Sequence, residues 1–136
     1  MDINGTQQFN ASPQQVWAAL HDSAKLQGCA SGGTTIAWAS NNLVITGTIP
    51  VINKTGTINV QVSDEQAPNH LRLSVNRANV NATADLNLAP SGSGTTLTYT
   101  AHADLSGPFS AASIVAKPMV DGQLKQFFSC LATKVS

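Results

Sequence analysis

The chain has 136 residues, of which 42% are hydrophobic and only 10% are charged, and its formal net charge is zero. A chain of this length buries roughly two-thirds of its unfolded surface, so we expect one domain over residues 1–136 that needs neither metal nor disulfide for stability. The absence of a basic surface excludes nucleic acid as an expected partner. No apolar run approaches the roughly 18 residues that a membrane span requires.

The N-terminus lacks the basic and apolar stretches of a secretory signal, which predicts a cytoplasmic protein, although a chain trimmed of its signal would look the same. Cys29 and Cys130 lie far apart and show no CxxC spacing. In a cytoplasmic protein we therefore expect two reduced thiols rather than a disulfide. The nearly neutral surface resists self-association poorly, which is compatible with a homodimer.

The first element is a strand over residues 2–10. Ser12, Pro13 and Gln15 then supply a cap, a proline at the first helical position and a glutamine at the third, which together predict a helix start. Asp22 caps a second short helix that ends at Gly28.

From residue 33 to residue 105 the sequence alternates strictly between apolar and polar residues, which predicts a meander of about six strands. The turns fall at residues 41–42, 53–54, 67–69 and 91–94, where asparagine, proline and glycine gather. One face of this sheet is apolar and the other is rich in Thr and Asn, so we expect one covered face and one wet face.

Residues 109–135 return to helical spacing, with Val120, Leu124 and Phe127 on one stripe, and predict a long C-terminal helix that covers the apolar face. Pro118 predicts a kink, or two helical pieces that meet near Lys117. The fold class is therefore α+β: a curved antiparallel sheet of about seven strands around a long C-terminal helix, with two short helices after the first strand.

A strongly curved sheet around one helix encloses volume, and several inward positions are small. Whether that volume is hollow or filled by aromatic and methionine side chains stays open at this point. The small positions are Ala82, Ala84, Ala101, Ala103 and Gly122, and the side chains that would fill the space are Trp38, Tyr99, Phe109, Met119 and Phe128.

Several residues and segments stand out within this order of elements: Gly5, the segments 11–20, 25–29, 82–90 and 94–99, Asp22, and the Phe127–Phe128 pair. With the order of elements, they resemble the START-like or SRPBCC superfamily, which has a helix-grip fold, over the whole chain. Within it the chain is similar to the CoxG family of carbon monoxide dehydrogenase accessory proteins, although residues 30–33 and 77–81 depart from that family's pattern.

The superfamily likeness implies a deep hydrophobic cavity between the sheet and the last helix. The narrower likeness implies an accessory protein of a molybdenum-containing carbon monoxide dehydrogenase, which handles a quinone and contacts the inner face of the cell membrane peripherally. We therefore expect a protein without catalytic activity or cofactor that carries an apolar molecule such as a quinone or another lipid. Pro118 is the expected gate, and the expected wall comprises Trp38, Val60, Val75, Ala84, Tyr99, Ile114, Met119 and Gly122.

Two alternatives remain. A START-like cyclase or hydrolase would need inward polar groups, of which the alternation supplies only Tyr99 and Arg77. A protein-binding assembly factor would use the Thr- and Asn-rich face. His21, His70 and His102 fall on separate elements, so we expect neither a metal site nor a catalytic cluster.

Overall fold

The chain folds into one seven-stranded antiparallel sheet and three helices in a computed structural model that describes residues 2–30, 33–49, 54–77, 80–107 and 113–135. The strand order is β1-β7-β6-β5-β4-β3-β2, so the first strand lies beside the last. The strands are β1 (Asp2–Phe9), β2 (Thr35–Ala39), β3 (Asn42–Ile49), β4 (Lys54–Gln66), β5 (His70–Arg77), β6 (Val80–Ser91) and β7 (Gly94–Leu105); the helices are α1 (Pro13–Leu20), α2 (Ser23–Cys29) and α3 (Ser113–Lys134).

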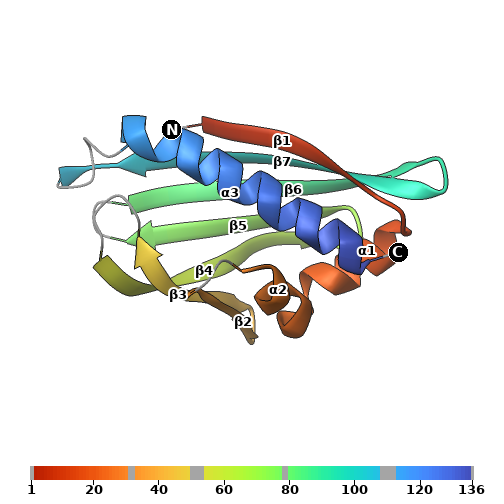
Figure 1. Cartoon of the computed structure of the whole chain (residues 1–136), viewed down its shortest axis with the longest axis horizontal. Helices are drawn as coiled ribbons and strands as arrows, with labels where there is room; N and C mark the ends of the chain where they lie inside the picture. Colours follow the sequence, from red (N-terminus) through yellow and green to blue (C-terminus); the bar gives the residue numbers. More distant parts are fainter. Residues whose placement is uncertain (1, 31–32, 50–53, 78–79, 108–112, 136) are drawn as a thin grey trace.

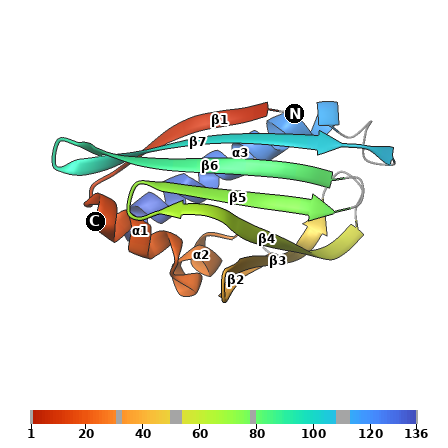
Figure 2. The ribbon, with the colours of Figure 1, turned by 180° about the vertical axis from the view of Figure 1, so that it is seen from behind.

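Helix α3 crosses one face of the curved sheet diagonally, and none of the described helices covers the opposite face (Figures 1 and 2). This arrangement is the helix-grip fold expected from the alternation of the strands and the periodicity of the last helix. The uncovered face presents polar side chains such as Thr57, Asn81 and Thr98, all of which are exposed. The polar–apolar alternation therefore predicted correctly which face of the sheet is covered.

Both predicted helix starts are present. Ser12 and Gln15 form a reciprocal capping box, in which the Ser12 Oγ accepts the Gln15 N–H and the Gln15 Oε1 accepts the Ser12 N–H. The carboxylate of Asp22 accepts the N–H groups of Ala24 and Lys25 at the start of α2. These local bonds satisfy amides that the helices themselves leave without partners.

Two local features differ from expectation. The turn between β2 and β3 is formed by Ser40 and Asn41, one residue earlier than predicted, because Ala39 pairs with Asn42 and Ser40 adopts a positive φ of 57°. Helix α3 continues without a break through Pro118, which excludes the two helical pieces that we gave as the alternative to a kink. Pro118 lies in the second turn of the helix, so the helix loses only one backbone hydrogen bond there.

Helix α2 protects the free edge of β2 with two side chains. The Ser23 Oγ accepts the Trp38 N–H at 2.9 Å, and the Gln27 side chain accepts the Ile36 N–H at 2.8 Å and donates to the Thr34 carbonyl at 3.0 Å. Residues four apart on a helix stand about 6 Å apart, which matches the spacing of alternate residues in a strand. Helix α2 therefore closes this edge much as a neighbouring strand would.

The solid core lies where α1 and the C-terminal half of α3 meet the ends of β1 and β7. Phe9, Val16, Leu97 and Leu131 are fully buried there. Within the part of the chain that the structure describes, no helix combines the length and the hydropathy that crossing a bilayer requires.

Candidate ligand-binding cavity

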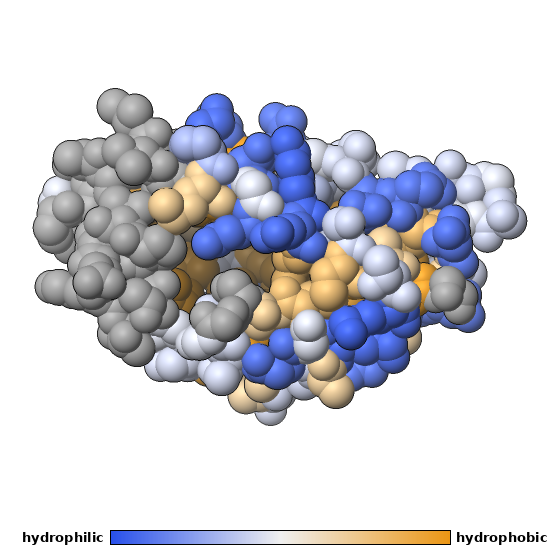
Figure 3. Space-filling view, in the orientation of Figure 1, coloured by the Kyte–Doolittle hydropathy of each residue, from blue (hydrophilic) through white to orange (hydrophobic). Residues whose placement is uncertain are grey.

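An apolar cavity of about 810 Å³ lies between the sheet, α2 and α3. Figure 3 shows it as an orange recess on the face that carries α3. Its volume falls within the roughly 300–1,000 Å³ that is usual for small-molecule sites. The sequence left open whether side chains fill this interior, and the structure shows that they leave it hollow.

The two ends of the cavity differ in the size of their side chains. Near α2 and the solid core, the wall is made of large residues: Leu26, Trp38, Leu71, Leu86 and Phe128. Toward the other end, where β5 ends and β6 begins, the wall contains several small residues beside the larger Ile45, Ile58 and Val75; the small ones are Gly47, Gly56, Ala82, Ala84, Ala101 and Ala103. The alanines were recognised in the sequence as small inward positions, whereas the two glycines were not.

The five predicted wall residues that lie on strands do line the cavity: Trp38, Val60, Val75, Ala84 and Tyr99. Strand parity is a simple guide to which face a side chain occupies, and it placed all five on the correct face.

Two of the wall residues predicted on the C-terminal helix do not line the cavity. Met119 and Gly122 are exposed, and the described wall from α3 consists instead of Val120, Gln123, Leu124, Gln126, Phe127, Phe128 and Cys130. At about 100° per residue, Gly122 lies on the opposite side of the helix from Val120, so helical phase excludes it from the wall. Pro118 is exposed, and the side chain of Ile114 lies outside the described residues.

Trp38 is held in the wall by three contacts. Its indole Nε1–H donates to the Leu20 carbonyl at 2.9 Å, and its backbone N–H donates to Ser23. Its ring stacks on His21 with centroids 5.1 Å apart and an interplanar angle of 8°. A side chain fixed in this way presents a rigid aromatic surface to the cavity.

Tyr99 is the one buried side chain whose polar atom lacks a hydrogen-bond partner among the described residues. It is 2% exposed, its ring stacks on Phe128 at 4.9 Å, and it lies over Gly5, its register partner on β1. A Cβ at position 5 would overlap the tyrosine ring, so glycine is required there. Burial, followed by the nearby charge of Asp121, raises the pKa of the Tyr99 hydroxyl.

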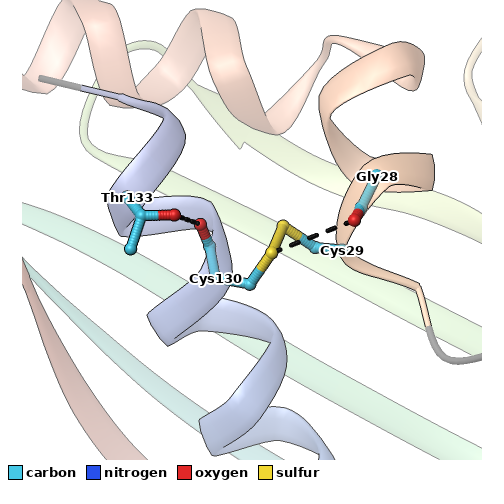
Figure 4. Close-up of a disulfide and its surroundings, with 4 residues drawn as sticks. All are labelled: Gly28, Cys29, Cys130 and Thr133. Carbon is cyan, nitrogen blue, oxygen red and sulfur yellow. Dashed lines mark hydrogen bonds between the residues drawn. A yellow bond between two sulfur atoms is a disulfide. The ribbon is translucent and has the colours of Figure 1, made fainter.

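A disulfide joins Cys29 at the end of α2 to Cys130 on α3, with the Cα atoms 5.7 Å apart (Figure 4). The expectation of two reduced thiols was therefore wrong. The sequence separation of 101 residues hid the pairing, because only the return of α3 across the sheet brings the two cysteines together. Cys130 Sγ also lies 4.0 Å from the Gly28 carbonyl; as a bridged sulfur carries no proton, we treat this as a packing contact.

Both cysteines border the cavity, so the bridge ties α3 to α2 at the narrow end of the hollow. Helix α2 is in turn bonded to β2 through Ser23 and Gln27. A continuous line of covalent and hydrogen bonds therefore joins α3, α2 and β2 beside this part of the cavity.

The three histidines lie apart on the surface, and each is paired with carboxylates. His21 Nε2 is 3.2 Å from Glu65, and His70 Nε2 is 3.4 Å from Asp85. His102 contacts Asp2 and Asp104, and the Asp2 hydrogen bond is the main reason why the pKa of His102 is raised. In the described parts of the chain, no three His, Cys, Asp or Glu side chains are grouped so that they could hold a metal ion.

Arg77, considered above as an inward polar group, is exposed and donates to the Thr57 carbonyl at 2.9 Å. The cavity lining described here contains no Asp, Glu, Lys or Arg. Its inward polar side chain on the strands is that of Tyr99. Thr34 also lines it, and Gln123 and Gln126 line it from exposed positions on α3. Thr83 and His102 border it only from strand positions whose side chains are exposed on the outer face of the sheet.

The fold and the cavity define a helix-grip protein with a hydrophobic pocket between its sheet and its last helix. Comparison with protein families matches residues 1–136 to the family described as "Polyketide cyclase / dehydrase and lipid transport". The chain belongs to this family.

Solved structures share the fold at low sequence identity. A conserved protein from Geobacillus kaustophilus is 23% identical, with a TM-score of 0.80, over 98% of this chain and 94% of that one. A protein from Mycobacterium smegmatis is 10% identical, with a TM-score of 0.73, over 99% and 90%. A protein from Thermus thermophilus is 16% identical, with a TM-score of 0.70, over the whole of both chains. Comparison with curated proteins finds no match.

Proposed function

We propose that this protein binds an uncharged apolar small molecule in the cavity and acts as a carrier or accessory factor rather than as an enzyme. The observation that carries the proposal is a hollow of about 810 Å³ whose described lining has no Asp, Glu, Lys or Arg. An ionised group placed in such a wall would lose its hydration without gaining a partner. The ligand is therefore neutral along the part that enters the cavity.

The size of the cavity supports useful affinity without polar anchors. At about 25 cal/mol per Å² of buried apolar surface, a ligand must bury roughly 160 Å² to offset an association cost of about 4 kcal/mol. Burying roughly 300 Å² contributes about 7 kcal/mol before that cost is subtracted. Even a compact ring with a short apolar chain exceeds the threshold.

Within this class we propose a quinone or another isoprenoid or aromatic lipid. The role that the sequence resemblance suggests is that of an accessory factor for a carbon monoxide dehydrogenase-like system, with peripheral contact to the membrane. The resemblance supports this narrower role through the segments 11–20, 82–90 and 94–99, whereas the family match supports the ligand class only. Pro118, exposed two residues before the wall residue Val120, is the proposed point at which α3 shifts to admit the ligand.

The decisive experiment combines identification of the natural ligand with a matched pair of variants. Native mass spectrometry and solvent extraction of protein from its own host should yield an uncharged lipid. Ala84→Trp should obstruct the cavity and weaken calorimetric binding of the extracted lipid. Asn81→Trp, on the exposed side of the same strand, should leave binding unchanged. Equal binding by both folded variants would refute the proposal.

An enzyme of the cyclase or dehydrase kind is the second candidate, and one observation favours it. The buried Tyr99 hydroxyl is a hydrogen-bond donor that has no described partner, and it belongs to a wall residue of the cavity. Such a group suits polarisation of a substrate carbonyl. Turnover of a polyketide-like substrate that Tyr99→Phe abolishes, while ligand binding persists, would establish this function in place of the carrier.

A further inference from the structure

Gly56 lies inside β4 and faces the cavity at its wide end. It is half-buried, lines the cavity, and pairs in register with Gly47 of β3. The neighbouring inward positions on these two strands are Ile45 and Ile58, which also line the cavity. A branched apolar residue is therefore the normal occupant of this surface, and position 56 departs from it.

The fold explains other glycines of the sheet but not this one. A Cβ at Gly94 would overlap the Phe9 carbonyl oxygen, which excludes a side chain there. At Gly47 a Cβ would stand 2.9 Å from the Thr34 Oγ1, so the Thr34 side chain would have to shift. At Gly56, no atom of a described residue lies within 4 Å of the Cβ position, and the φ angle is not in the left-handed region.

Glycine inside a strand weakens it, because the unfolded chain gains freedom and no side chain packs. The glycine at position 56 therefore costs stability without a steric reason in the described structure. What it provides is empty volume inside the cavity wall.

This volume adjoins the other small residues of the wall. The Arg77 guanidinium bonds to the carbonyl of Thr57, so Gly56 lies near the end of β5, where β6 begins. Ala82 and its partner Ala103 line the same end of the cavity. The large side chains of Trp38 and Phe128 line the opposite part of the cavity, which the disulfide also borders.

We propose that Gly56 is a specificity-determining residue, which keeps one end of the cavity wide enough for the ring system of a ligand whose slimmer part extends toward Trp38. The inference rests on the proposed binding function and refines its ligand class to molecules that carry a ring. A slim alkyl chain does not need the space above Gly56, whereas a fused ring does.

The test compares two neutral probes on three proteins by calorimetry in non-reducing buffer. The ring probe is menadione, a fused-ring quinone, which cannot alkylate cysteines that are held in the disulfide. The slim probe is decanol. The variants are Gly56→Val and a matched control, Asn59→Val, whose side chain is exposed on the outer face of the same strand.

Gly56→Val should weaken menadione binding about tenfold or more, because the isopropyl group overlaps the ring. It should change decanol binding less than threefold and leave the urea midpoint unchanged or higher, because a β-branched residue favours a strand. Asn59→Val should bind both probes as the unmodified protein does. This combination of preserved stability with selective loss of the ring probe supports the inference.

Three results would overturn it. Gly56→Val could bind menadione as tightly as the unmodified protein, or lose both probes equally, and either result would show that position 56 does not select for rings. Failure of both Gly56→Val and the smaller Gly56→Ala to fold would show that the space is not open. If the unmodified protein binds neither probe, the cavity-binding function itself fails, which is a distinct outcome.

Discussion

Removal of the Cys29–Cys130 bridge should be the most damaging change that leaves the core residues intact. The cysteines are 101 residues apart, so the bridge closes a loop that spans most of the chain. The chain-entropy relation for a loop of this length gives about 4.7 kcal/mol of stabilisation, and measured disulfides typically contribute about 2–4 kcal/mol. Small domains have about 5–15 kcal/mol of total stability, so the loss is a large fraction of it.

The assay is urea denaturation of the Cys29→Ser/Cys130→Ser double variant and of the unmodified protein, each with and without a phosphine reductant. The oxidised protein should unfold with a free energy about 2–5 kcal/mol above that of the double variant. Reductant should bring the unmodified protein close to the variant and leave the variant unchanged, which controls for side effects of the reductant.

Two observations would refute this reasoning. One is the presence of two titratable thiols in natively purified protein that has never met a reductant. The other is a difference of less than about 1 kcal/mol between the oxidised protein and the double variant. The first result would show that packing alone joins the two helices, and the second would show that the bridge adds little stability to that packing.

The remaining predictions concern three polar side chains. Tyr99→Phe removes a buried hydroxyl that lacks a described partner, so urea denaturation should show equal stability or a gain of about 1 kcal/mol; a loss of that size would mean that the hydroxyl is bonded. Tyr99 is the sole tyrosine, and its pKa is raised in the folded protein, so the midpoint of its absorbance titration should lie at a higher pH in the folded protein than in the unfolded chain. Its contribution to stability should be full below about pH 10 and should be lost as pH rises through the folded pKa. Asp2→Asn should lower the pKa of His102 in an NMR titration, and an unchanged pKa would contradict the pairing. Because the pKa of His102 is raised in the folded protein, the stability that this residue contributes is full below about pH 6.5 and is lost as pH rises through the raised pKa. Gln27→Ala should accelerate hydrogen exchange of the Ile36 amide by about tenfold, and unchanged exchange would show that the edge of β2 is protected in another way.

The two ends of the molecule differ in how densely they are packed, which is what a carrier requires. One end is solidly packed around Phe9, Leu97 and Leu131, and it supplies stability. The other end is hollow and walled by small residues such as Ala82 and Gly56. A protein that binds an apolar molecule has to keep its packed core separate from its binding cavity, because close packing of apolar side chains would otherwise fill the cavity.

The wall of the site could be predicted from the sequence on the strands but not on the helix. Side chains on a strand have only two directions, so alternation placed Val60 and Tyr99 on the inner face without knowledge of the tertiary structure. A helix offers a continuous range of directions, and choosing residues of α3 by size rather than by phase wrongly included Gly122. The apolar stripe read from the sequence does mark the side of α3 that faces the cavity, since Val120, Leu124 and Phe127 all line it.

By itself, the sequence determined the elements and their order, because capping, turns and periodicity are local properties that residues a few positions apart already express. Only the tertiary structure decided that Cys29 meets Cys130, that α2 closes the edge of β2, and that the interior stays hollow. These features depend on distances between segments far apart in the chain and on how completely side chains fill the space that they enclose. Neither quantity is encoded in a pattern of neighbouring residues.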